Sequence, residues 1–306
     1  MEKFYGELSS LVEELDISGK ALYTASNSIY KHYHPVTIPK KNGESRQLYV
    51  PDEFMKSIQR RINEKLLSKE EVSPFASAYV PGGSTKRNAS PHIGQPMILK
   101  LDIRHFFDRL IYPLVKEKAF PKEKYSESNR VLLSVICVYM DALPQGAPTS
   151  PIISNIILRE FDNKVGNWCM ERGVVYTRYC DDMTFSGEFD AKEVIVFVKK
   201  ELKEMGLFLN NKKTVIAGKG QKHIVTGIVV NEKMSLPKAY KRQIRQEMYY
   251  CMKYGVESHL KASKINETPQ EYISKLLGRI NYVLSVEPEN VDMREYSKRI
   301  NERMRL

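Results

Sequence analysis

The chain lacks the sequence marks of a disulfide-rich, zinc-binding or membrane protein. Its 306 residues include only four cysteines, none of them in a Cys-x-x-Cys pair, and no histidine stands at zinc-ligand spacing. Such sparse cysteine favours reduced thiols in a cytoplasmic protein. The N-terminus has no signal-peptide pattern. Because the longest apolar stretch, near residues 131–140, is too short to span a bilayer, no membrane partner is expected.

Positive charge, in contrast, is in excess. Lys and Arg number 48 against 37 Asp and Glu, which gives a net charge of +11 at pH 7. An excess of this size suggests that the partner is a polyanion such as a nucleic acid, although a basic but inert surface stays open as an alternative. The length, with 42% hydrophobic residues, suits one large or two modest domains.

Hydrophobic periodicity predicts a mixed α+β chain that ends in an all-helical part. Residues 1–35 are expected to form short helices and loop, 40–43 a turn, and 79–94 loop or short elements. The expected strands are 45–50, 97–103, 174–178, 183–187 and 223–230, with short strands within 206–220. The expected helices are 51–68, 130–139, 149–171, 191–205 and, after Pro237, the rest of the chain with breaks near Gly255 and Pro288.

Three aspartates stand at the ends of predicted strands. Asp181 and Asp182 lie between strands 174–178 and 183–187, at the expected tip of a hairpin, and Asp102 ends a buried strand. A buried lone carboxylate is costly unless it is paired or bound to a metal ion. One antiparallel sheet could present all three to Mg²⁺, which prefers oxygen ligands and, as a pair of ions, supports phosphoryl transfer. Taken alone, the adjacent pair fits a solvated turn better than a metal site, and Asp102 fits an N-cap or turn position.

Three segments around these aspartates resemble the palm motifs of reverse transcriptases. Residues 101–107 (LDIRHFF) resemble motif A, 143–151 (LPQGAPTSP) resemble motif B, and 179–182 (YCDD) resemble motif C, with Cys180 where many relatives have Ala. Their order and spacing match the family, and motif B is highly specific. The resemblance implies an α+β right-hand polymerase fold with fingers, a palm built on an antiparallel sheet, and a helical thumb. The expected division is 1–96 for the N-terminal region and fingers, 97–232 for the palm and 233–306 for the thumb.

The resemblance also implies which residues carry the chemistry. Asp102 and Asp181 correspond to the principal metal ligands, and Asp182 is the second aspartate of motif C. The implied cofactor is a pair of Mg²⁺ ions. The positions expected to bind them are Asp102, Ile103, Asp181 and Asp182.

Four further positions resemble the family's nucleotide-binding residues. Arg46 matches the fingers arginine that grips the incoming triphosphate, a contact that suits a bidentate guanidinium. Phe107 stands at the steric gate, where a ring would collide with a ribose 2′-hydroxyl and favour dNTPs, although a core aromatic is the alternative. Gln145 and Gly146 are expected to approach the nucleotide and the template, the glycine because it allows close backbone contact.

A lysine pair resembles motif D, whose lysine protonates the leaving pyrophosphate. Lys213 is the favoured catalytic residue, although Lys212 is adjacent. Because residues 208–222 contain four lysines and no acid, plain phosphate binding competes with the catalytic interpretation.

Two elements resemble retron reverse transcriptases in particular. Residues 88–92 (NASPH) resemble their Asn-Ala-x-x-His element, and 225–227 (VTG) resemble a triplet associated with recognition of the cognate non-coding RNA. Basic and tyrosine residues at 233–253 suit the backbone of an A-form duplex, or else a solvated helix face. The loop 78–84 has no arginine, unlike many bacterial relatives. The expected RNA-recognition residues are Asn88, His92, Val225, Thr226, Gly227, Lys241, Arg242 and Arg245.

The resemblance implies an RNA-directed DNA polymerase that uses dNTPs and takes a cognate non-coding RNA as template and primer. Synthesis would begin at the 2′-hydroxyl of an internal guanosine and leave a branched RNA–DNA hybrid, the msDNA. A role in antiphage defence beside a separate effector protein is also implied. Two alternatives stay open: another bacterial reverse transcriptase, of group II intron or other defence type, and an RNA-binding scaffold without catalysis.

Overall fold

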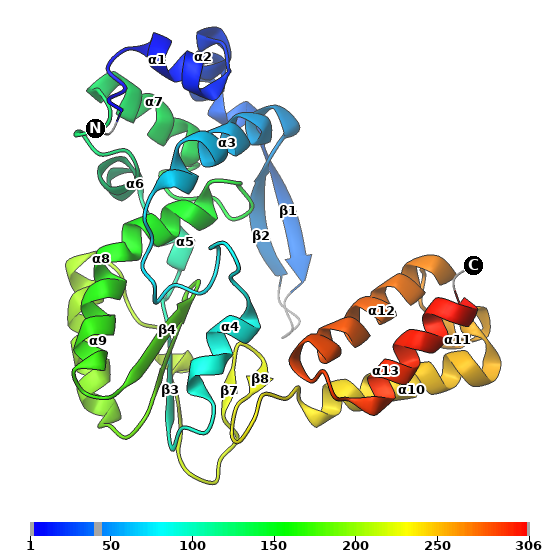
Figure 1. Cartoon of the computed structure of the whole chain (residues 1–306). Coiled ribbons are helices and arrows are strands. Elements are labelled where there is room, and N and C mark those ends of the chain that lie inside the picture. The colour runs from blue at the N-terminus through cyan, green and yellow to red at the C-terminus, as the bar shows by residue number, and fades with distance from the viewer. Residues whose placement is uncertain (1–2, 40–44, 305–306) are drawn as a thin grey trace. The chain divides into compact units, whose positions relative to one another are not determined.

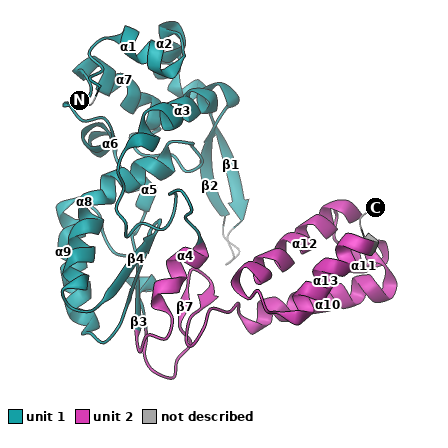
Figure 2. Ribbon diagram, in the orientation of Figure 1, with its two compact units in different colours: residues 1–84, 98–216 teal, residues 85–97, 217–306 magenta. Residues whose placement is uncertain are grey.

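The structure, a computed structural model, describes residues 3–39 and 45–304, so the turn predicted at 40–43 lies outside the described residues. The chain forms two compact units (Figures 1 and 2). Unit 1 comprises Met1–Ser84 and Ile98–Ile216, and unit 2 comprises Thr85–Met97 and Ala217–Leu306. The three-part division into fingers, palm and thumb stays a prediction beside this division by packing.

Unit 1 contains a four-stranded sheet with the order β4-β5-β3-β6. Both β3 and β4 pair antiparallel with β5, and Leu101 of β3 lies opposite Met183 of β5. β3 is buried along nearly its whole length, and only Lys100 is partly exposed. The bounds are β3 Ile98–Asp102, β4 Val175–Tyr179, β5 Asp182–Ser186 and β6 Val215–Ala217.

The helices α8 (Ser150–Met170) and α9 (Ala191–Glu204) pack beside this sheet (Figure 1). The rings of Trp168 and Phe197 stack between them with centroids 4.5 Å apart. α8 begins directly after the motif B loop, where two prolines and a glycine prevent regular structure. The helix therefore joins motif B to the back of the sheet.

The remainder of unit 1 contains the N-terminal helices and a separate hairpin of β1 (Tyr33–Pro39) and β2 (Ser45–Pro51). β1 was not expected, because its apolar alternation covers only Val36-Thr37-Ile38 between two prolines. Six of its seven residues are exposed. Asp52 caps α3 by accepting a hydrogen bond from the Met55 amide at 2.9 Å. The helices are α1 Leu8–Leu15, α2 Gly19–Asn27, α3 Glu53–Lys65, α5 Phe106–Arg109, α6 Tyr112–Ala119 and α7 Glu127–Cys137.

Unit 2 combines a small hairpin with the C-terminal helices. The single strand expected at 223–230 is wrong: β7 (Ile224–Val225) and β8 (Ile228–Val229) form a hairpin instead. The chain reverses at Thr226 and Gly227, whose φ angles of 45° and 84° are both positive, as two-residue hairpins of type I′ require. The helices are α4 Thr85–Ala89, α10 Lys238–Tyr254, α11 Val256–Ala262, α12 Pro269–Val286 and α13 Val291–Arg299.

The predicted mixture of helices and strands, and the all-helical end of the chain, are confirmed. Within the described residues, no helix combines the length and the apolar composition needed to cross a bilayer.

Candidate active site

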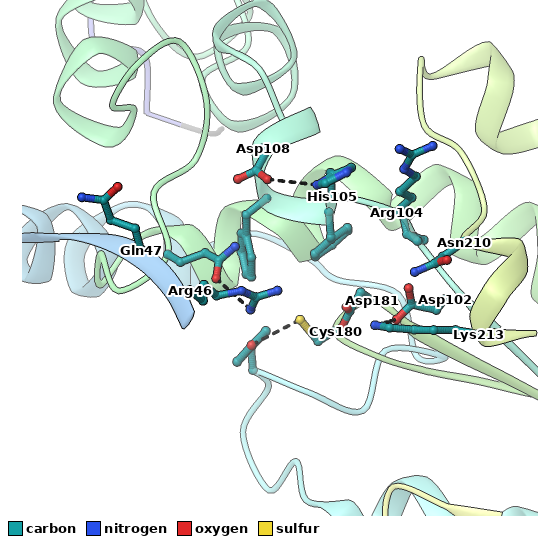
Figure 3. A pocket seen from close by; sticks show the side chains of 15 residues that line it. Arg46, Gln47, Asp102, Arg104, His105, Asp108, Cys180, Asp181, Asn210 and Lys213 are labelled. Atoms are coloured by element: carbon teal, nitrogen blue, oxygen red, sulfur yellow. Dashed lines mark hydrogen bonds and ion pairs between the residues drawn. The ribbon is translucent and has the colours of Figure 1, made fainter. Parts of the chain in front are cut away.

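A polar cavity of about 620 Å³ lies in unit 1 where β2, the motif B loop and the ends of β3 and β4 meet (Figure 3). The structure brings most of the nucleotide-site residues predicted for unit 1 to its walls. Asp182 and Gly146 are the two members of that set that do not line it. The predicted residues that line it are Arg46, Asp102, Ile103, Phe107, Gln145, Asp181 and Lys213.

The three aspartates come together through the register of the sheet. Asp102, at the end of β3, lies directly opposite Asp182, the first residue of β5. In an antiparallel pair, such partners have Cβ atoms about 4.5–5.5 Å apart on one face. Asp181 occupies the turn between β4 and β5, and its carbonyl accepts a hydrogen bond from the Ile103 amide at 3.0 Å. Ile103 therefore ties motif A to motif C through its backbone, while its side chain is buried.

The carboxylates are in an environment that disfavours their negative charge. Burial raises the pKa of Asp181 above its ordinary 3.8, and repulsion from Asp102 raises it further. Burial and then repulsion from Asp181 raise the pKa of Asp182 in the same direction. Since folding raises these two pKa values, the fold loses stability as pH rises through them. A cation at this site would offset that loss, and its affinity would fall on acidification because protons compete for the same oxygens.

Lys213 supplies one positive charge to this site. Its Nζ atom lies 2.6 Å from Oδ2 of Asp102, and this hydrogen bond raises the lysine pKa above its ordinary 10.5. The Asn210 amide also donates to the Asp102 carbonyl at 2.8 Å, which fixes the lysine-bearing segment beside β3. Of the two adjacent lysines in motif D, Lys213 is the one that lines the cavity. Its role as the proton donor stays a prediction.

The donor set suits Mg²⁺ in its chemistry. Asp102, Asp181 and Asp182 offer hard carboxylate oxygens, and the buried Ile103 can offer only a backbone carbonyl. Within residues 3–39 and 45–304, no three His, Cys, Asp or Glu side chains already surround a common point as a closed metal site. Mg²⁺ does not need such a cage, because it binds through one or two carboxylates and completes its shell with water and substrate phosphates.

Arg46 and Gln145 meet at another wall of the cavity, and Gly146 lies directly after Gln145. Arg46, on β2, donates from Nη1 to Oε1 of Gln145 at 3.2 Å, although 99 residues separate them. Gly146 has a φ of 105°, a conformation that favours glycine, and a Cβ there would lie 3.5 Å from Val50. Phe107 lines the cavity half-buried, with its ring packed edge-on against Phe106 at 5.1 Å. This placement fits the steric gate and leaves Phe107 partly in the core.

A contact between two cavity residues, Tyr79 and Cys180, was not predicted from the sequence. The Tyr79 hydroxyl donates to Sγ of Cys180 at 3.3 Å, and both residues line the cavity with φ angles of 60°. Tyr79 belongs to the loop that lacks an arginine. Burial raises the pKa of the Cys180 thiol to about 11, so the thiol is protonated at neutral pH. A tyrosine in a loop has no periodicity, so the sequence carried no signal for this contact.

In unit 2, the two retron-like elements pack together. Asn88, His92 and Val225 are fully buried, and burial lowers the pKa of His92 to about 4. The Thr226 hydroxyl donates to the Thr85 carbonyl at 3.0 Å, and Gly227 is exposed at the tip. The hairpin therefore packs on α4 through buried residues, and Thr226 and Gly227 are the members of the set that reach solvent.

The predicted RNA-contact residues of α10 differ in how far they are available. Lys241 is mostly buried and contacts both carboxylate oxygens of Glu287, at 2.7 and 2.8 Å. Arg245 pairs with Asp292 at 2.7 Å, and Arg242 is exposed. Lys241 thus stabilises the helical part of unit 2, and Arg242 is the better placed of the three for a phosphate.

Known proteins with sequences similar to this chain are reverse transcriptases, in agreement with its motifs. Residues 38–230 match the family described as reverse transcriptase (RNA-dependent DNA polymerase). The chain is 33% identical over 263 residues to the retron Ec86 reverse transcriptase of Escherichia coli, covering 80% of this chain and 81% of that protein. It is 31% identical over 283 residues to the retron Ec83 reverse transcriptase of Escherichia coli, covering 86% of each. It is also 31% identical over 283 residues to the retron Mx65 reverse transcriptase of Myxococcus xanthus, and spans 63% of that longer protein.

Proposed function

The chain belongs to the reverse transcriptases, the RNA-directed DNA polymerases, and to their retron type, and on this premise we propose that it copies a cognate structured RNA into DNA at the cavity of unit 1. Family membership confirms the right-hand polymerase fold expected from the motifs. The observation that carries the proposed site is the register that sets Asp102 opposite Asp182, with Asp181 in the adjoining turn.

Each wall of the cavity has a part in the proposed reaction. Mg²⁺, when bound at the carboxylates, supplies the positive charge that lowers the barrier to phosphoryl transfer, and we propose two such ions. Asp102, Asp181 and Asp182 hold that charge next to the reacting phosphate. Arg46 binds the triphosphate, and its bond to Gln145 sets the guanidinium before substrate arrives.

Two residues then act on the bound nucleotide. Phe107 excludes a ribose 2′-hydroxyl by contact with its ring, which makes dNTPs the substrates. Lys213 Nζ, which lies 2.6 Å from Oδ2 of Asp102, gives its proton to the leaving pyrophosphate.

At a finer level, we propose that the cognate non-coding RNA serves as both template and primer and that the product is a branched msDNA. Support comes from the retron relatives and from the hairpin tip of Thr226 and Gly227, which packs on α4 and bonds to the Thr85 carbonyl. The same relatives support a role in antiphage defence beside a separate effector protein. Free cysteines, three of them buried, support a cytoplasmic location.

The experiment that tests the function replaces both aspartates of motif C. Asp181→Asn with Asp182→Asn should lower Mg²⁺-dependent dNTP incorporation on an RNA template at least about 10³-fold, because the charge that binds the metal is lost. RNA binding, measured by filter retention, should stay within about twofold, since it depends on basic residues elsewhere.

A control is Asp16→Asn, which removes an exposed carboxylate of unit 1 that does not line the cavity. It should leave incorporation unchanged. Two results would contradict the proposal: full incorporation by the double variant, or no incorporation by the wild type on any primed RNA, in which case the chain is an RNA-binding scaffold.

A further inference from the structure

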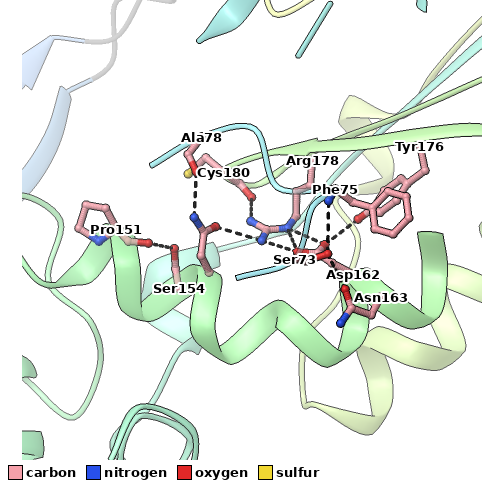
Figure 4. Close-up of polar contacts among 11 residues, drawn as sticks. Ser73, Phe75, Ala78, Pro151, Ser154, Asp162, Asn163, Tyr176, Arg178 and Cys180 are labelled. Atoms are coloured by element: carbon pink, nitrogen blue, oxygen red, sulfur yellow. Dashed lines mark hydrogen bonds and ion pairs between the residues drawn. The ribbon is translucent and has the colours of Figure 1, made fainter. Parts of the chain in front are cut away.

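One buried cation stands directly beneath the turn that carries Asp181 (Figure 4). Arg178, on β4, and Asp162, on α8, are both completely buried and form an ion pair. Taking two charges out of water costs several kcal/mol per ion unless good geometry and further hydrogen bonds offset it. Well-packed apolar residues often stabilise a core equally well. The pair therefore calls for a reason beyond the stability of the fold.

The Arg178 guanidinium contacts two groups: the side chains of α8 and the carbonyl of Cys180. Nε and Nη2 bind the two carboxylate oxygens of Asp162 at 2.8 and 2.6 Å, and Nη2 also reaches Oδ1 of Asn155 at 3.1 Å. The Tyr176 hydroxyl holds the same carboxylate at 2.8 Å. With its position fixed by α8, the guanidinium donates from Nη1 to the Cys180 carbonyl at 2.8 Å.

That carbonyl controls the orientation of the catalytic turn. Because a peptide unit is planar, holding the Cys180 oxygen also fixes the amide of Asp181 on the other side of the bond. Cys180 has a φ of 60°, a conformation that is strained for a residue other than glycine and that persists only when its surroundings enforce it. Arg178 acts on the carbonyl of this residue, and the Tyr79 hydroxyl acts on its thiol.

The same network fixes the loop that carries Tyr79. The Arg178 amide donates to the Phe75 carbonyl at 2.8 Å, and the Ser77 amide donates back to the Arg178 carbonyl at 2.8 Å. The Asn155 amide group donates to the Ala78 carbonyl at 2.8 Å. Arg178 and the loop that carries Tyr79 are thus both hydrogen-bonded to α8.

We propose that Arg178 is a positioning residue for the metal-binding aspartates: fixed by Asp162, it holds the Cys180 carbonyl and keeps the strained turn in the conformation that directs Asp181 and Asp182 toward Asp102, with Tyr79 as a second, weaker hold. The inference deepens the proposed function and rests on it. It adds that α8, which starts at motif B, sets the geometry of the motif C carboxylates.

The test is Arg178→Lys, which keeps the charge but loses the planar fork that reaches Asp162 and Cys180 together. Hydrogen exchange of the amides in a peptide spanning 179–183 should become about tenfold faster, because a hydrogen bond from a charged group is lost. The Mg²⁺ concentration for half-maximal dNTP incorporation should rise about tenfold on the same ground, with kcat reduced and the KM for primed RNA unchanged.

Arg130→Lys is the matched control. Arg130 is also buried in unit 1, pairs with Glu117 and Glu127, and donates to the Phe120 carbonyl at 2.8 Å, but on α7. A comparable loss of stability there should leave both the exchange at 179–183 and the Mg²⁺ midpoint at wild-type values. Matching shifts in the two variants would mean that Arg178 is only structural.

If Arg178→Lys does not fold, Tyr79→Phe decides the question, because it removes one hydroxyl from a side chain that is 44% exposed. It should give the same two shifts at smaller size. Unchanged exchange and an unchanged Mg²⁺ midpoint, in whichever variant folds, would overturn the inference. The exchange measurement needs no turnover, so its result stands even where the wild type makes no DNA and the proposed function fails.

Discussion

Two hairpins of this chain reverse through two residues each and are held in different ways. The turn from β4 to β5 passes through Cys180 and Asp181, and the turn from β7 to β8 passes through Thr226 and Gly227. The first is half-buried and held at both the carbonyl and the thiol of Cys180. The second is joined to its support by the Thr226 hydroxyl and ends in an exposed glycine.

The difference fits the role that we propose for each turn: metal binding for the first and RNA recognition for the second. Metal-binding carboxylates must stay within a fraction of an ångström of their working positions, so their turn needs support from several elements. A tip that meets an RNA needs an accessible backbone on a rigid base, which the buried Asn88 and His92 provide. The first turn should therefore affect synthesis on every template, and the second only on the RNA that it recognises.

The largest expected effect near the first turn, short of losing a carboxylate, comes from Lys213, which bonds to Asp102. Lys213→Ala should lower the single-turnover rate about 10²-fold on cognate and generic RNA alike, because the proton donor at the carboxylates is lost. Lys212→Ala removes the same charge from the adjacent residue and should stay near the wild-type rate. Equal losses in the two variants would show that both lysines only bind phosphate, and a loss confined to cognate RNA would break the contrast between the turns.

A smaller and more selective effect is expected at the second turn. Gly227→Val places a β-branched residue at a φ of 84°, a strain of about 1–3 kcal/mol that should distort the tip. Initiation on the cognate RNA should fall about tenfold, while extension of a DNA primer on generic RNA stays unchanged. The control is Gly220→Val, at a φ of 88° outside the hairpin. Equal losses on both RNAs would mean that the tip is structural.

The sequence predicted the catalytic turn well, because hydrophobic runs flank it and its motif is local. The prediction for residues 223–230 was wrong, because an apolar run broken only by Thr226 and Gly227 resembles one strand. The support of the first turn was invisible for another reason. Asp162 and Arg178 lie on different elements, so their contact exists only in the folded chain. The same holds for Lys241, whose partner Glu287 lies 46 residues away.

Asp102 and the Cys180–Asp181 turn are proposed to form one site for divalent cations. The most direct measurement is Mn²⁺ binding followed by electron paramagnetic resonance, with a dideoxy-terminated primer on an RNA template and the next dNTP present. Asp102→Asn should weaken Mn²⁺ binding about tenfold or more relative to the wild type and to Asp16→Asn, because a principal oxygen ligand loses its charge. An Asp102→Asn variant that binds Mn²⁺ with wild-type affinity would contradict the account.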